Sequence, residues 1–436
     1  MSVIDLGELR GDVEPDPPPR PPRAVGRPLR VALAGAVALL ALASSAPLVR
    51  PASAVVDGGL GREVRVAGGR LYVADQEMPG AGGTRGVTAY ATPAGAGGAL
   101  RPLWRTSVPG GEGLFQVLEH GGFVLITGGG GRDGGMVETV ALDAATGRHR
   151  WRQPGFPVPT IGGGLLLFGG GDDETVDPLR VVDLPSGRPR WSAPMHRGRT
   201  VYDHRSAEVD RVVLIPESGR IEVRDAGSGA VVLTSDPGRG GSPGYQGVGL
   251  AGELLLVTAN NGVDGSRRVT AYGLAALDRR WELDLSPDEY LEECGDLLCV
   301  GSREAGLSAL DPATRRPRWV NPRWQRFVAA RGGRLLVAAD DRVAAVELAV
   351  LDAATGRTIA ELGRWELMPN QGQDEPLFGG RRTREGGLLV AELDPAGAVA
   401  RWFDVLPDVV EDCYSSGRDL LCRRANGTYG WRRLPR

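Results

Sequence analysis

All four cysteines of the chain lie in two similar stretches, CGDLLC and CYSSGRDLLC, and both stretches end in Asp-Leu-Leu-Cys. Cysteine thiolates can bind zinc, and paired cysteines can form disulfides. If each stretch is a hairpin, its two cysteines face each other within disulfide distance. The predicted structural disulfides are Cys294–Cys299 and Cys413–Cys422. A zinc site built from all four thiolates is the alternative, although neither pair has the two-residue spacing that is usual for zinc.

Other residues that could do chemistry are not spaced for it. The glycine-rich stretches 128–135 and 169–174 lack the Gly-Lys-Ser/Thr sequence of a phosphate loop. The acidic loops around Asp172 and Asp340 and the turn after Asn260 fit no calcium-loop template. The histidines have no metal-ligand spacing; they are His120, His149, His196 and His204. We therefore expect no catalytic residue, no cofactor and no metal site.

Composition limits the class of protein. The 436 residues include 66 glycines and 32 prolines, yet 42% are hydrophobic, so the chain is rich in turns and can still build a large core. A formal net charge of -3 provides no overall basic field to attract nucleic acid. Every one of the 51 basic residues is arginine, which is typical of GC-rich genomes such as those of actinobacteria.

The N-terminal region predicts a membrane anchor. Residues 1–30 contain PDPPPRPPR and no apolar periodicity, which indicates a disordered cytoplasmic tail. Residues 31–49 carry no charge and approach the length of about 20 residues that crosses a bilayer as a helix. The arginines before this segment place the rest of the chain outside the cell. A signal peptide cleaved after Ala54 is the alternative, because Ala-Ser-Ala precedes that point. Both interpretations export the remainder to an oxidising compartment, where disulfides persist.

The exported part contains a repeat in which a glycine follows an aspartate by four residues and a tryptophan follows it by eight. The clearest copies are Asp143, Gly147, Trp151 and Asp183, Gly187, Trp191, and partial copies are Asp311, Trp319 and Asp394, Trp402. Looser copies contain Trp104, Asp225, Trp281 and Asp352. The marks of the repeat, each a tryptophan or the residue in its place (Leu233 and Ala360), fall at 104, 151, 191, 233, 281, 319, 360 and 402. The steps are 38 to 48 residues, the period of a four-stranded propeller blade.

Each part of the repeat has a structural purpose. Short apolar runs such as FVLITG, residues 123–128, predict strands before the aspartate. The aspartate can accept hydrogen bonds from the following amides, and the glycine can adopt the positive φ of a tight turn. The tryptophan then lies on the next strand, where its large ring can fill the gap between neighbouring blades.

The frame Ala-Leu-Asp-x-x-Thr-Gly-x-x-x-Trp resembles the tryptophan-docking repeat of PQQ-type propellers, a family that includes quinoprotein alcohol dehydrogenases and the BamB-type outer-membrane assembly lipoprotein. The resemblance covers roughly residues 60–434 and implies an all-β, PQQ-like β-propeller. Eight marks predict eight blades, with seven and nine as alternatives. The C-terminal strands and an N-terminal strand would share a closing blade, and the fourth or eighth unit would be the degenerate one. Quinone-binding members carry an adjacent Cys-Cys pair that this chain lacks, so the resemblance implies the fold without PQQ.

These observations together predict a membrane-anchored scaffold without enzymatic activity. Residues 50–59 are a linker or closing strand, and residues 60–436 form the extracytoplasmic propeller. One face of the propeller would bind a protein or a cell-envelope ligand. The alternatives are a quinoprotein-like oxidoreductase or another enzyme with its site in the central channel, and a sensor that signals to the tail.

Overall fold

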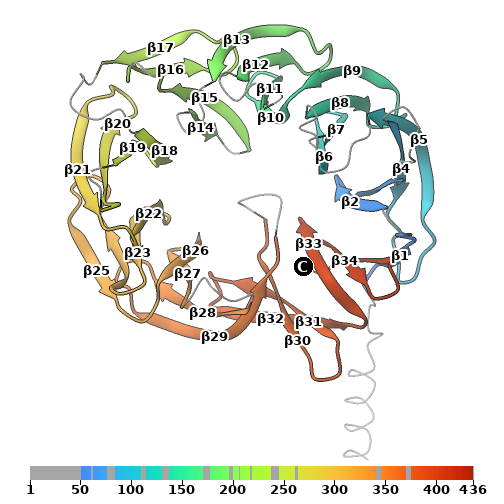
Figure 1. Cartoon of the computed structure of the whole chain (residues 1–436). Helices are drawn as coiled ribbons and strands as arrows, with labels where there is room; N and C mark the ends of the chain where they lie inside the picture. The colour runs from blue at the N-terminus through green and yellow to red at the C-terminus, as the bar shows by residue number, and fades with distance from the viewer. Residues whose placement is uncertain are drawn as a thin grey trace, which may run out of the picture. The chain divides into compact units, whose positions relative to one another are not determined.

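The apolar runs of the sequence fold as antiparallel strands. The structure is a computed structural model, and it describes residues 51–59, 62–75, 84–109, 114–129, 137–169, 177–195, 200–205, 207–216, 219–236, 245–260, 264–339, 345–369 and 375–435. The predicted tail, 1–30, and the predicted membrane segment, 31–49, lie outside these residues. No helix among the described residues is both long and apolar enough to span a membrane. The fold is all-β, as predicted, and Figure 1 shows curled sheets that follow one another around a ring.

Groups of four strands, here called modules, follow one another along the chain. Module 1 contains β2 (Glu63–Ala67), β3 (Arg70–Ala74), β4 (Thr84–Ala91) and β5 (Arg101–Pro109). Module 2 contains β6 (Leu114–His120), β7 (Phe123–Gly129), β8 (Glu138–Asp143) and β9 (His149–Pro154). Module 3 contains β10 (Phe156–Thr160), β11 (Gly164–Phe168), β12 (Asp177–Asp183) and β13 (Pro189–Met195). Module 4 contains β14 (Thr200–Arg205), β15 (Glu208–Leu214), β16 (Ile221–Asp225) and β17 (Val231–Ser235).

The second half of the chain repeats the pattern. Module 5 contains β18 (Tyr245–Ala251), β19 (Leu254–Asn260), β20 (Arg267–Gly273) and β21 (Arg279–Leu285). Module 6 contains β22 (Tyr290–Glu293), β23 (Leu298–Ser302), β24 (Gly306–Leu310) and β25 (Pro317–Asn321). Module 7 contains β26 (Arg326–Arg331), β27 (Arg334–Ala338), β28 (Ala345–Asp352) and β29 (Thr358–Leu367). Three additional strands follow, β30 (Phe378–Arg382), β31 (Leu388–Asp394) and β32 (Val399–Leu406).

A closing module joins the two ends of the described chain. It contains β33 (Val409–Ser416), β34 (Asp419–Arg424), β35 (Tyr429–Arg433) and, as its outer strand, β1 (Ser53–Val56). β1 pairs with β35 over four residues, and the Tyr414 hydroxyl of β33 donates to the Val64 carbonyl of module 1 at 2.7 Å. The ring is therefore closed by strands from both ends of the chain, which is the arrangement that the sequence predicts.

The additional strands β30–β32 do not form a sheet of their own. β30 pairs with the end of β29 through Glu366 and Leu367, so β26–β32 make one seven-stranded sheet. These strands carry the Asp394 and Trp402 marks of the predicted eighth unit, which is thus the degenerate one. Modules 3 and 4 are also connected, by one parallel pair between Thr160 and Val209.

A β-bulge recurs between the third and fourth strands of modules 1 to 7. In module 2, for example, Trp151 pairs with Ala141 and His149 pairs with Leu142, so one residue is left out of the ladder. Because side chains alternate between the two faces of a strand, this extra residue determines which face the tryptophan occupies. It turns the tryptophan toward the next module, where the core between modules lies.

Candidate functional site

The aspartates of the repeat cap the turns between the third and fourth strands. Asp143 Oδ1 accepts hydrogen bonds from the Thr146 amide at 3.0 Å and from its hydroxyl at 2.8 Å. Asp143 Oδ2 accepts from Arg150 at 3.0 Å. These donors lower the pKa of Asp143 to about 2, the Thr146 hydroxyl being the main cause. Asp183 has the same arrangement with Ser186 and Arg190, and Asp311 has it with Thr314 and Arg318.

Each docked tryptophan binds the aspartate turn of the following module. Its indole Nε1 donates to a main-chain carbonyl there, and the rings of Trp104, Trp151, Trp191 and Trp319 lie over the turn glycine, where the turn that Trp281 binds has Arg315. The pairs are Trp104 with Ala144 (3.1 Å), Trp151 with Leu184 (2.7 Å), Trp191 with Ala226 (2.9 Å), Trp281 with Pro312 (2.7 Å) and Trp319 with Ala353 (2.8 Å). The turn glycines Gly147 and Gly187 have φ values of 70° and 65°, and a Cβ on either would come within 2.5 Å of the indole. These turns and tryptophans therefore hold neighbouring modules together.

Trp402 departs from this pattern. Its side chain is 66% exposed. In the β31–β32 ladder Trp402 pairs with Ala391, and the bulge lies after the tryptophan instead of before it. Because no extra residue precedes Trp402 in the ladder, its ring lies on the other face of the strand and points away from the closing module. Glu392 occupies the position that is apolar in modules 1 to 7, and it makes an ion pair with Arg418 of the closing module at 2.8 Å. The prediction that Trp402 docks like the other tryptophans is wrong.

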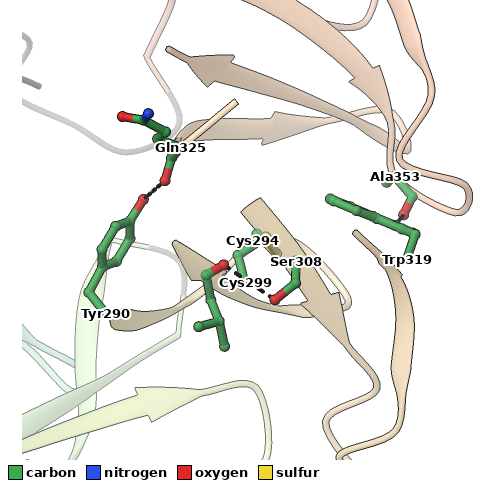
Figure 2. The surroundings of a disulfide bond; sticks show 8 residues. Tyr290, Cys294, Cys299, Ser308, Trp319, Gln325 and Ala353 are labelled. Atoms are coloured by element: carbon green, nitrogen blue, oxygen red, sulfur yellow. Dashed lines mark hydrogen bonds between the residues drawn. A yellow bond between two sulfur atoms is a disulfide. The ribbon is translucent and has the colours of Figure 1, made fainter. Parts of the chain in front are cut away.

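Both predicted disulfides are present in the structure. Cys294 and Cys299 have a Cα–Cα distance of 5.7 Å, and Cys413 and Cys422 one of 4.1 Å. The sequence pattern favours matching places for the two bridges in their hairpins, but the structure shows different ones. Cys294 and Cys299 close a tight turn between β22 and β23 (Figure 2), where the Cys294 amide donates to the Leu297 carbonyl at 2.9 Å. Cys413 and Cys422 instead pair directly within the β33–β34 ladder.

The turn closed by the first disulfide separates two cavities on the surface. One cavity has a volume of about 500 Å³ and lies between modules 5 and 6; the other has about 460 Å³ and lies between modules 6 and 7. Gly295, Asp296 and Leu297 line both, so this turn is a shared wall. Below, the first cavity is called the acidic pocket and the second the basic pocket, after the charges described next.

The two pockets differ in charge. The acidic pocket is lined by Glu253, Glu293 and Asp296, whose carboxylates have no hydrogen-bond or ion-pair partner among the described residues. Its one arginine, Arg280, is paired with Asp278 at 2.9 Å. The basic pocket is lined by Arg331 and Arg334, the same Asp296 and apolar residues. The turn therefore lies between a negative and a positive cavity.

Docked tryptophans support a wall of each pocket. Pro312, whose carbonyl accepts from Trp281, lines the acidic pocket, and Ala353, whose carbonyl accepts from Trp319, lines the basic pocket. Figure 2 shows Trp319 pointing from module 6 to Ala353 of the next module, beside the disulfide. Tyr290 adds a further link, because its hydroxyl donates to the Gln325 carbonyl at 2.8 Å. The repeat thus fixes the position of the site that its turns build.

A buried carboxyl lies on the strand that leads to this turn. Glu292 Oε1 is buried and has no hydrogen-bond partner in the described structure. Burial raises the pKa of Glu292 to about 7, although the charge of Arg326 acts in the opposite direction. The folded chain therefore binds more protons than the unfolded chain between the usual value of 4.5 and about pH 7. The contribution of Glu292 to the free energy of unfolding should fall as the pH rises through this range.

We expect Glu292→Gln, which mimics the protonated carboxyl, to remove that decline. The melting temperature of the variant should equal that of the wild type at pH 4.5 and exceed it at pH 8, because only the wild type buries a charge at the higher pH. Thermal melts at both pH values measure this. The assignment would be contradicted if the melting temperatures of variant and wild type differed by the same amount at both pH values, or if the variant were the less stable protein at pH 8.

The remaining sequence candidates form no metal site among the described residues. His149 Nε2 lies 2.8 Å from the Ser107 carbonyl, and His120 Nε2 lies 3.4 Å from Glu208, so both make contacts between modules. Within the described residues no group of three or more His, Cys, Asp or Glu could hold a metal ion. Outside them lie His196, most of the glycine-rich stretches, the acidic loops at Asp172 and Asp340, and the end of the Asn260 turn.

A family model matches the part of the chain that contains the clearest copies of the repeat. Residues 85–240 match the family model described as outer membrane protein assembly factor BamB, and they contain the docked Trp104, Trp151 and Trp191. Among solved structures, BamB from Moraxella catarrhalis is 15% identical, with coverage of 88% of this chain and 97% of that chain and a TM-score of 0.42. A europium-containing methanol dehydrogenase is 14% identical, with coverage of 86% and 83% and a TM-score of 0.37. The chain matches none of the curated proteins.

Proposed function

We propose that this PQQ-like β-propeller repeat protein is a binding scaffold, and that a partner protein docks around the Cys294–Cys299 turn. The observation that carries the proposal is the pair of cavities that share this one turn. Their volumes fall within the range of about 300–1,000 Å³ that is common for binding pockets. The matched family model describes an assembly factor, which supports a protein as the partner.

The local structure favours binding without rearrangement. The disulfide restrains the turn, and docked tryptophans restrain the turns across each pocket. A surface that is already ordered loses less conformational entropy when it binds. A rigid site of this kind suits a scaffold, which must present one fixed surface to its partner.

We also propose that residues 31–49 anchor the chain in the cytoplasmic membrane and that the propeller lies outside. The uncharged segment after Arg20, Arg23, Arg27 and Arg30 supports this topology, and two disulfides suit an oxidising compartment. Eight four-stranded modules support a ring of eight blades in which β30–β32 are an insertion.

The topology predicts that the chain fractionates with the cytoplasmic membrane. Protease added to wall-stripped cells should degrade everything after about residue 50, and lysed cells serve as the control for access to the tail. Immunoblots with antibodies against the tail and the propeller measure both parts. A soluble cytosolic pool as the main product would overturn this topology.

Affinity capture from detergent-solubilised membranes tests the scaffold. We expect the full chain to retain a partner at constant stoichiometry and Asp296→Arg to lose it, because Asp296 is exposed and lines both pockets. Glu385→Arg is the matched control, since Glu385 is an exposed acidic residue in the turn between β30 and β31. Proteins that bind both variants equally, or no partner at all, would contradict the proposal.

A further inference from the structure

The two pockets carry opposite charges on either side of a single turn, and this points to the chemistry of the partner. We propose that they bind one extended peptide segment, with a basic side chain in the acidic pocket and an acidic side chain in the basic pocket. The inference rests on the proposed function, because it assigns the segment by which a partner protein would dock at the same turn.

The acidic pocket has the chemistry to bind a lysine or arginine. Glu253, Glu293 and Asp296 supply three carboxylates that no described side chain neutralises, whereas Asp311 at its edge is already paired with Arg318. Leu254, Leu297, Leu298 and Pro312 provide apolar wall. Long basic side chains place an aliphatic stem against such a surface and the charged group beside carboxylates.

The basic pocket has the chemistry to bind a carboxylate. Arg331 donates to the main-chain carbonyl of Glu375, so this contact leaves its positive charge without a carboxylate partner in the described structure. The Thr355 hydroxyl is the main cause of the lowered pKa of Asp352, and the charge of Arg334 acts in the same direction, so Arg334 already lies near one carboxylate. Apolar contact is available from Leu335, Ala353 and Ala354. A glutamate or aspartate of the ligand would therefore meet Arg331 first.

One ligand that fills both pockets must cross the turn at Asp296 and Leu297. A polyanion such as a nucleic acid or an acidic glycan would be attracted by one pocket and repelled by the other. An extended peptide places successive side chains on different sides of its backbone and can carry both charges at a short spacing. The charge pattern therefore favours a peptide over a uniformly charged polymer.

A peptide series with the full chain in detergent tests the inference. The probes are acetylated, amidated peptides with one lysine and one glutamate, separated by one to four leucine or glycine residues, in both orders. We expect calorimetry at low salt to detect binding of at least one of these peptides. Replacing its lysine by norleucine, or its glutamate by glutamine, should each weaken binding about tenfold.

Variants of the chain then assign each charge to its pocket. In the double variant Glu253→Gln, Glu293→Gln, replacing the peptide's lysine by norleucine should no longer change the affinity. Replacing the peptide's glutamate by glutamine should still weaken it. Arg331→Gln should do the reverse, and Arg334→Gln replaces it if Arg331→Gln melts at a lower temperature than the wild type. Glu385→Gln should leave both differences unchanged.

The possible outcomes separate this inference from the proposed function. No binding by any probe, or equal binding of the charged and neutral probes, overturns the peptide assignment. The scaffold proposal stands in that case if Asp296→Arg still loses the captured partner. If capture does not depend on Asp296 but the probes bind as expected, the scaffold proposal fails and the peptide site remains.

Discussion

Trp319→Ala should lower the free energy of unfolding by about 3–5 kcal/mol, as expected for a buried large-to-small substitution. The Trp319 side chain is 8% exposed and belongs to the core between modules 6 and 7. Its Nε1 donates to the Ala353 carbonyl at 2.8 Å, so the variant also leaves that acceptor without its donor. Urea unfolding followed by circular dichroism measures the effect.

Trp402→Ala is the matched control for this prediction. It removes the same side chain from the same place in the repeat, but Trp402 is 66% exposed. We expect a change within about 0.5 kcal/mol, which is usual for surface substitutions. Equal losses of stability in the two variants would contradict the distinction between docked and undocked tryptophans, and so would a Trp319→Ala variant with unchanged stability.

Gly356→Ala should destabilise the fold more than Gly333→Ala does. Both glycines have positive φ, 68° at Gly356 and 70° at Gly333, so both variants incur a similar backbone strain of about 1–2 kcal/mol. A Cβ at Gly333 meets nothing within 4 Å, whereas a Cβ at Gly356 would overlap the indole of Trp319. Displacing that ring should cost about 1–3 kcal/mol more.

Urea unfolding of the two glycine variants isolates the docking contact, because the backbone strain cancels in the difference. In the Trp319→Ala background the difference should shrink, since the ring that the new methyl group would displace is gone. A difference that persists in that background would show that Gly356 is needed for a reason other than tryptophan docking.

Much of the fold could be predicted because the repeat combines local turn chemistry with one long-range contact. Asp143 and Gly147 form their turn from neighbouring residues, and the spacing of Trp151 follows from the ladder. The failure at Trp402 also has a local cause. Glu392, two residues before Asp394, is charged where the docking modules have alanine or valine, and this signal could have excluded the eighth unit.

The candidate site could be predicted only in part. The two stretches that end in Asp-Leu-Leu-Cys pointed to the turn at 294–299, but not to its pockets. Glu253 and Asp296 come from turns and Arg331 from the end of β26, in three successive modules, and only the order of the modules brings them to one surface. Spacing along the sequence carries no such information, because each of these charges looks like an ordinary solvated residue at or near a turn.

Hydrogen exchange of the captured complex tests the central claim, that a partner protein binds at the Cys294–Cys299 turn. Binding should slow exchange in the turns at 293–298 and 330–335 relative to the free chain, because these turns line the two pockets. The turn at 383–387, between β30 and β31, serves as the internal reference and should not change. Unchanged exchange at both pocket turns, with slowing confined to other modules, would contradict the claim.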